Sequence, residues 1–430
     1  MSERIVIVDG IRTPFCKAGT VFKDISADDL GAFAVKEIMA RTHLDAALID
    51  ELIIGNVSQP ANAANIARVI ALKAGLPNSL IAHTVHRNCA SGMEAVSTGI
   101  DKILAGNAQI IVAGGTESMS NIPLLYNAKM TGLFAQLMKA KTVWQKLAAL
   151  SRFRLSYLKP IIGIQEGLTD PVCGLNMGQT AEVLAKEFHI LRDEQDRFAL
   201  SSHQKAVHSM NNKIFAQEII PIPIPPANKA MQIDDNGPRA DQTLQALAKL
   251  KPFFDRYYGT VTVGNACPVT DGAAALVLMR ESKAREMGYT PLGAIRAYAY
   301  AGLEPERMGL GPVYATSKLL QQTGIHFSDF DLIEINEAFS VQVLACERAF
   351  ASDTFAQRYL GREHAVGAID PEKLNVNGGA VALGHPVGST GTRLLITLLK
   401  ELRRRNKSLG LASLCIGGGQ GAAFAVEVLS

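Results

Sequence analysis

Residues 49–54 read IDELII, and residues 330–335 read FDLIEI. Each run is apolar and of strand length, and a turn of small residues and a helical pattern follow it. A second apolar run then closes each unit, at residues 110–119 (IIVAGGTESM) and 411–421 (LASLCIGGGQG). Strands that alternate with helices indicate an α/β fold with a largely parallel sheet.

The two units look like copies of each other. Matched positions lie 281, 296 and 301 residues apart (49 and 330, 89 and 385, 110 and 411). A slow drift in one order is expected for duplicated halves that carry loop insertions. We therefore predict two similar halves whose reactive turns, around Cys89 and His385, face each other. A chance likeness of two unrelated strand–helix–strand units is the alternative.

The composition excludes several classes of protein. The 430 residues include 37 glycines, 48% are hydrophobic and only 19% are charged, which excludes a disordered or fibrous chain. The net charge of +3 shows no polyanion-binding signature, so we expect no nucleic-acid partner. The six cysteines form no CxxC pair, so we expect neither a disulfide framework nor a metal site. The strand-like run 5–8 opens the chain without a secretory signal, and we expect a cytoplasmic protein.

A basic segment separates the halves. Residues 118–165 hold seven lysines and arginines and no acidic residue. Within it an apolar position recurs at steps of four and three, which predicts one helical stripe with a cationic opposite face: Leu133, Leu137, Ala140, Trp144 and Leu147. Such a helix can lie on an anionic membrane or dock a partner, or it can simply pack on the body of the protein.

Cys89 is the first candidate for chemistry. It precedes a helix expected over 93–104, with Met93, Val96, Ile100, Ile103 and Leu104 on one face. The helix dipole and free backbone N–H groups should favour its thiolate, the nucleophilic form. Small residues follow it, which permits close approach of a substrate. The alternative is a buried, inert cysteine.

Three further segments carry polar groups on turns. Cys415 opens a glycine run that includes Gly417, whose exposed N–H groups can bind an oxyanion. The run is too close to the end of the sequence for a dinucleotide site. His385 lies between Gly384 and a proline, on a turn, with a structural histidine as the alternative. Asn336 follows an expected strand, with helix capping as the alternative.

Together these segments resemble the thiolase family over essentially the whole chain. The matching motifs occur in the family's order: residues 9–15 (DGIRTPF), 88–92 (NCASG), 259–266 (GTVTVGNA), 270–274 (TDGAA), 336–339 (NEAF), 378–391 (GGAVALGHPVGSTG) and 415–423 (CIGGGQGAA). The resemblance implies a five-layered αβαβα fold made of two duplicated halves. Residues 1–120 with 251–281 would form one half and 282–430 the other, with a loop domain inserted at 121–250.

The resemblance also implies roles for the site residues. Cys89 would be the nucleophile that carries the acyl group, and His385 would activate it and form an oxyanion hole. Asn336 would hold a water in that hole, while the backbone N–H of Gly417 would contribute to a second one. Cys415 would be the general acid and base, with an acidity close to that of the CoA thiol.

Two residues that we expect to contact substrate lie where the chain departs from the family pattern. Met177 lies in Asn-Met-Gly where many short-chain thiolases have His-Met, and Cys267 replaces a serine that contacts pantetheine. Both changes bear on CoA contact and acyl preference.

The implied activity is that of a 3-ketoacyl-CoA thiolase, which uses CoA as a substrate and no resident cofactor. An acetoacetyl-CoA thiolase and a non-catalytic thiolase-like scaffold are the alternatives. Residues of about 123–170 look like the insertion of the β-subunit of the fatty-acid β-oxidation trifunctional complex. That likeness implies a homodimeric core, assembly with a hydratase/3-hydroxyacyl-CoA dehydrogenase α-subunit, and membrane contact through residues 123–165.

Overall fold

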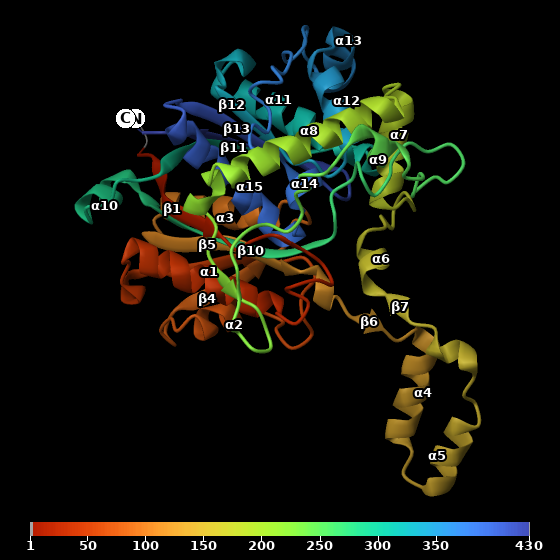
Figure 1. Ribbon diagram of the computed structural model, residues 1–430. Helices are drawn as coiled ribbons and strands as arrows, with labels where there is room; N and C mark the ends of the chain where they lie inside the picture. The colour runs from red at the N-terminus through yellow and green to blue at the C-terminus, as the bar shows by residue number, and fades with distance from the viewer. Residues whose placement is uncertain (1–2, 430) are drawn as a thin grey trace.

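The computed structural model describes residues 3–429 and contains five alternating layers of helices and strands (Figure 1). Two sheets each separate an outer pair of helices from a shared central pair. The first sheet contains β1 (Ile5–Arg12), β2 (Cys16–Lys17), β3 (Glu51–Gly55), β4 (Ile81–Val85), β5 (Ile110–Ser118) and β10 (Thr270–Arg280). The second contains β11 (Gly293–Gly302), β12 (Leu332–Ile335), β13 (Leu409–Ile416) and β14 (Gln420–Glu427).

The helices fill the other three layers. The main helices are, in the outer layer of the N-terminal half, α1 (Ala27–Thr42) and α2 (Ile66–Lys73); in the centre, α3 (Ser91–Leu104) and α15 (Val387–Arg404); and in the outer layer of the C-terminal half, α11 (Gly311–Thr323) and α12 (Ser340–Phe350). Shorter helices are α10 (Glu281–Glu286), α13 (Asp353–Phe355) and α14 (Ala380–Leu383). The five-layered duplication predicted from the sequence is confirmed, since β3, α3 and β5 recur as β12, α15 and β13.

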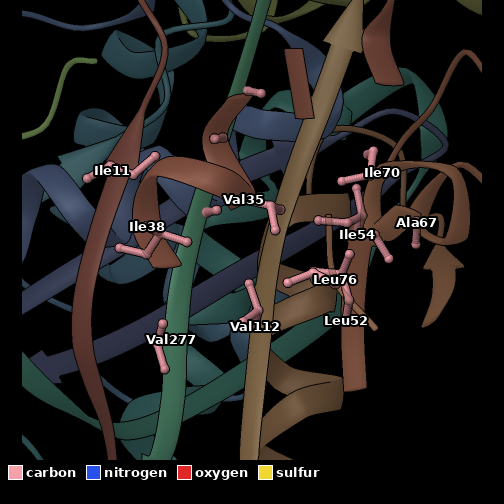
Figure 2. Packing of buried hydrophobic residues seen from close by; sticks show 14 of the residues in the cluster. Ile11, Val35, Ile38, Leu52, Ile54, Ala67, Ile70, Leu76, Val112 and Val277 are labelled. Atoms are coloured by element: carbon pink, nitrogen blue, oxygen red, sulfur yellow. The ribbon is translucent and has the colours of Figure 1, made fainter. Parts of the chain in front are cut away.

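Successive residues of each strand pack on opposite faces of the sheet, against the outer helices or against the central helices. In β5, Val112 packs outward against α1 and α2, where Figure 2 shows it beside Val35 and Leu52. Its neighbour Ile111 packs inward, in the same cluster as Met93 of α3. Because both faces of these strands are buried, they are apolar throughout rather than alternating with polar residues.

The prediction of a largely parallel sheet is wrong. Strand pairs β3–β4, β3–β5 and β12–β13 are parallel, but β1–β10, β5–β10, β11–β14 and β13–β14 are antiparallel. The turn between β13 and β14 is only three residues long, which forces a hairpin. In addition, β1 pairs with both β10 and β11, so hydrogen bonds join the sheets of the two halves into one ladder.

The segment between β5 and β10 contains the remaining elements. They are β6 (Leu124–Leu125), α4 (Ala128–Lys139), α5 (Val143–Leu150), β7 (Ile161–Ile162), α6 (Gly163–Gly167), α7 (Met177–Glu187), α8 (Arg192–Asn211), β8 (Ile222–Pro223), β9 (Met231–Gln232) and α9 (Leu244–Ala248). In Figure 1, α4 and α5 lie side by side as a helical hairpin that projects from the body.

The predicted single apolar stripe over 133–147 is wrong. The helix ends at Lys139, Ala140 is extended, and Thr142 begins α5 through a capping box with Gln145. The apolar positions are therefore divided between two helices, and Trp144 remains 80% exposed. In α3 the predicted face is buried except for Leu104, which is half exposed.

The central helices contact each other through glycines near their N-termini. A Cβ added to Gly391 of α15 would lie 2.6 Å from the backbone nitrogen of Met93 in α3. Likewise, a Cβ added to Gly92 of α3 would lie 2.8 Å from the backbone nitrogen of Thr392 in α15. The hydroxyl of Thr392 donates to the carbonyl of Gly92 (3.1 Å). Only glycine permits the two helix ends to approach this closely.

Replacing Gly391 by alanine should therefore force α3 and α15 apart. The overpacking should lower stability by about 1–3 kcal/mol, measured as a lower midpoint of thermal unfolding. The matched control is Gly132→Ala in α4, where an added Cβ meets nothing within 4 Å and should be neutral or slightly stabilising. Equal melting points for Gly391→Ala and the native chain would contradict the close-packing argument.

Candidate active site

Cys89 lies in the turn that leads from β4 into α3. Asn88 has a left-handed backbone (φ 43°), which lets the chain turn sharply before the helix. The side chain of Ser91 closes the turn by donating to the carbonyl of Asn88 (2.7 Å) and accepting the N–H of Arg87 (2.9 Å). The thiol is thereby presented at the N-terminal end of a buried central helix.

A side chain of the same turn ties it to the glycine loop of the other half. The amide of Asn88 donates to the carbonyl of Gly417 (2.7 Å), and the backbone N–H of Gly417 is directed at the sulfur of Cys89. Cys415 is the last residue but one of β13, two residues before Gly417, and is 1% exposed. The structure therefore brings together two cysteines that are 326 positions apart in the sequence (89 and 415).

Burial determines the ionisation of both thiols. The N–H groups of Gly417 and of Cys89 itself lower the pKa of Cys89, but burial raises it more. The backbone N–H groups thus act in the expected direction, toward the thiolate, but burial outweighs them in the resting protein. Burial, and then the charge on a neighbouring Cys89 thiolate, raise the pKa of Cys415 well above its usual value. The expected match between the acidities of Cys415 and the CoA thiol stays a prediction.

His385 lies on the turn between α14 and α15, as the sequence predicts. Gly384 has φ 101°, and a Cβ there would overlap the hydroxyl of Thr270, which accepts the backbone N–H of His385 (3.2 Å). The ring nitrogen Nδ1 lies 2.6 Å from Oγ1 of Thr390. Nε2 is buried and has no hydrogen-bond partner among residues 3–429. Burial, and then Arg393, lower the pKa of His385 to about 3, so the ring is neutral at ordinary pH.

Asn336 follows β12 and is fully buried. Its backbone N–H donates to Ser413 (2.9 Å), but Nδ2 and Oδ1 of its side chain have no partner in the described part of the chain. Because α12 begins only at Ser340, Asn336 does not cap a helix. A buried amide with both ends free is costly unless a water or ligand satisfies it.

Glu337 fixes the loop that carries Asn336. Its carboxylate accepts hydrogen bonds from Ser202 (2.6 Å), Asn375 (2.9 Å) and the backbone of Val381 (3.1 Å). Burial raises the pKa of this carboxyl, whereas the three donors oppose that change. The loop after β12 is thereby held against the segment that leads to His385.

The two residues expected to contact substrate also lie beside this centre. Met177 begins α7, and its sulfur would lie 3.1 Å from a Cβ added to Gly417. Cys267 donates its backbone N–H to Ala338, in the Asn336 loop (3.1 Å). Burial, and then the charge on a Cys89 thiolate, raise the pKa of Cys267 to about 12. Asn88 and Thr390 belong to motifs that match the family, but we predicted no role for either, because their hydrogen bonds join separate segments or cross a helical turn.

The chain matches two family models and several known proteins. The thiolase N-terminal domain matches residues 5–282, and the thiolase C-terminal domain matches residues 289–428. The chain is 43% identical over 427 residues to 3-ketoacyl-CoA thiolases of Yersinia pestis and Yersinia pseudotuberculosis, covering 99% of this chain and 97% of theirs.

Solved structures agree with this assignment. The acetyl-CoA acetyltransferase of Bacillus anthracis superposes with a TM-score of 0.87 at 37% identity, over 99% of both chains. Human mitochondrial 3-ketoacyl-CoA thiolase superposes with a TM-score of 0.86 at 34% identity, over 100% of this chain and 99% of that one. The chain belongs to the thiolase family of acyltransferases.

Proposed function

We propose that the protein is a 3-ketoacyl-CoA thiolase, which cleaves 3-ketoacyl-CoA with CoA into acetyl-CoA and a shortened acyl-CoA. Two observations carry this proposal. The turn of Cys89 is hydrogen-bonded to the glycine loop that follows Cys415, and the buried side chains of His385 and Asn336 have polar atoms without a partner among residues 3–429. Relatives at 43% identity are named 3-ketoacyl-CoA thiolases, which favours this activity over that of an acetoacetyl-CoA thiolase. A human thiolase has been solved with CoA, which supports CoA as the second substrate.

In the first half-reaction, Sγ of Cys89 attacks the keto carbon and the Cα–Cβ bond breaks. The acyl group remains on Cys89 as a thioester, and acetyl-CoA leaves as its enolate. His385 and a water held by Asn336 stabilise that enolate oxygen, since preorganised donors act best where charge develops. The N–H groups of Cys89 and Gly417 form a second oxyanion site for the tetrahedral intermediates.

Cys415 supplies the proton for the leaving carbanion and then takes a proton from incoming CoA. The raised pKa suits both steps. It keeps Cys415 protonated in the resting protein, and it makes the thiolate formed after donation a strong base toward the CoA thiol. Met177 and Cys267 would line the path of the CoA thioester, which their positions beside Gly417 and beside the Asn336 loop support.

Cys415→Ala separates the two halves of this chemistry. Transfer of an acetyl group from acetyl-CoA to Cys89 should continue, because it needs no carbon acid or base. Exchange of the acetyl-CoA methyl protons with solvent, and thiolysis of 3-ketoacyl-CoA, should fall by roughly 10²-fold or more, as for loss of a general acid–base group. Mass spectrometry of the protein measures the acetyl group on Cys89, and NMR measures the exchange of the methyl protons. The control is Cys173→Ala, which should affect neither; equal loss of both steps in Cys415→Ala would make Cys415 structural.

The hairpin formed by α4 and α5 is a second functional surface. It exposes large apolar side chains, with Trp144 at 80%, Met138 at 87% and Val143 at 71%. Its basic residues are exposed as well, and residues 118–165 hold no acidic residue. The alternative, in which the apolar side chains of this segment pack against the thiolase domains, does not fit these exposed fractions. Apolar side chains beside cations are typical of segments that lie at an anionic lipid surface.

We propose that residues 123–165 contact an anionic membrane peripherally. Among residues 3–429, no helix is long and apolar enough to cross a bilayer. The likeness to the trifunctional β-subunit supports a further proposal, that the protein assembles with a hydratase/3-hydroxyacyl-CoA dehydrogenase α-subunit. Six free thiols support a reducing, cytoplasmic location.

We further propose that two copies pair through β4. β4 is an edge strand of the sheet. Its residue Ile81 is 61% exposed, although the neighbouring strand β3 is entirely buried. An exposed edge strand has unpaired backbone groups that a second copy can satisfy. The edge leads directly into the Cys89 turn, so pairing would support the active site.

Reversing the charge of Lys139, Lys141, Lys146, Arg152 and Arg154 to glutamate tests the hairpin. Binding to vesicles that contain phosphatidylserine should be lost, whereas thiolysis of a short substrate should stay within about twofold, because all five are surface charges far from Cys89. Native binding should weaken with salt. Retention of lipid binding would refute the membrane proposal.

The same variant separates the other two proposals. If it binds lipid poorly but still co-purifies with the α-subunit, complex assembly uses another surface. Sedimentation should give a dimer for the native and the charge-reversed chain, since β4 lies apart from the hairpin. A monomer in both cases would contradict pairing through β4.

A further inference from the structure

The hydroxyl of Thr390 contacts the side of His385 that faces away from its free nitrogen. Thr390 lies in the first turn of α15 and is fully buried. Its Oγ1 lies 2.6 Å from Nδ1 of His385 and 3.1 Å from the carbonyl oxygen of Pro386. A carbonyl oxygen can only accept, whereas the imidazole nitrogen can donate or accept.

The two contacts favour one direction of hydrogen bonding. If Thr390 donates to Nδ1, its oxygen accepts from no donor among residues 3–429 and the hydroxyl makes one bond. If Thr390 donates to Pro386, it can also accept Nδ1–H, and the three groups form a chain in which each supports the next. Donation to the carbonyl four residues earlier is also common for threonine in helices, and the Thr390 hydroxyl has the geometry of a donor toward the Pro386 carbonyl.

This chain determines what Nε2 can do. With the hydrogen on Nδ1, the buried and unpartnered Nε2 carries a lone pair. Such a nitrogen can accept the Cys89 thiol proton, which leaves a thiolate and an imidazolium. It then carries the hydrogen with which it can donate to the oxygen that develops charge.

We propose that Thr390 is a positioning residue that holds His385 in the Nδ1–H tautomer, so that Nε2 acts first as a base and afterwards as a donor. The proposal rests on the proposed thiolase function but concerns a residue that does not touch the substrate. A neutral ring with the opposite tautomer would present a hydrogen to Cys89 and could not take its proton. The wrong tautomer in a comparable buried histidine is a severe defect.

The tautomer can be measured without any reaction. Two-bond ¹H–¹⁵N correlation spectra of the ¹⁵N-histidine-labelled protein separate Nδ1–H from Nε2–H rings. The His385 signals are those that vanish in His385→Ala, among nine histidines. We expect Nδ1–H in the native protein and in Thr390→Ser, and a mixture of tautomers in Thr390→Val. An Nε2–H ring in the native protein would overturn the proposal even if the enzyme is an active thiolase.

The kcat/KM values of Thr390 variants provide a second test of the proposal. Thr390→Val keeps the branched shape but removes the hydroxyl, and should lower kcat/KM for thiolysis by about 10- to 100-fold, more than one neutral hydrogen bond and less than complete loss of orientation. Thr390→Ser should recover activity to within about threefold. The control is Ser389→Ala, which removes an adjacent buried hydroxyl that has no partner in the described residues.

A merely structural role predicts a different pattern. Thr390→Val would then lower the melting temperature, but the folded fraction would keep native kcat/KM and the native tautomer. That pattern would overturn the proposal. If Thr390→Val does not fold, the native and Thr390→Ser spectra still decide the tautomer. Loss of thiolysis in the native chain itself would instead contradict the proposed function.

Discussion

The glycine contact between α3 and α15 is the constraint on which the site depends. Cys89 precedes one of these helices and His385 the other, so the approach of Gly92 and Gly391 determines how closely the two side chains can meet. The hydrogen bond from Asn88 to Gly417 then adds the glycine loop and Cys415 to the same place. Each half of the duplication supplies only part of this arrangement, which explains why the active centre requires both.

Burial gives the site its electrostatic character. It raises the pKa of Cys89 and lowers that of His385, so the resting pair is a neutral thiol and a neutral imidazole rather than an ion pair. Charge therefore arises only when a proton moves during the reaction, in the presence of groups arranged to stabilise it. The buried amide of Asn336, with both ends free, is consistent with a place kept for water or substrate.

The sequence predicted the five-layered fold and the segments that form the site, because apolar runs, glycine turns and family motifs are local patterns. It did not predict the antiparallel pairs around β1, β10 and β14, since strand direction depends on connections rather than on composition. The neutral state of Cys89 was missed as well, because a helix end is visible in sequence but desolvation is not. Similarly, the stripe from Leu133 to Leu147 has regular spacing, yet Ala140 is extended and the helix breaks there.

We propose above all that Cys89 accepts the acyl group when the 3-ketoacyl chain is cleaved. The most direct test mixes the protein with a small excess of 3-ketohexadecanoyl-CoA in the absence of CoA, followed by peptide mass spectrometry. We expect a tetradecanoyl thioester on Cys89 together with release of one equivalent of acetyl-CoA. Release of acetyl-CoA without an adduct, or an adduct on Cys415 or Cys267, would contradict it.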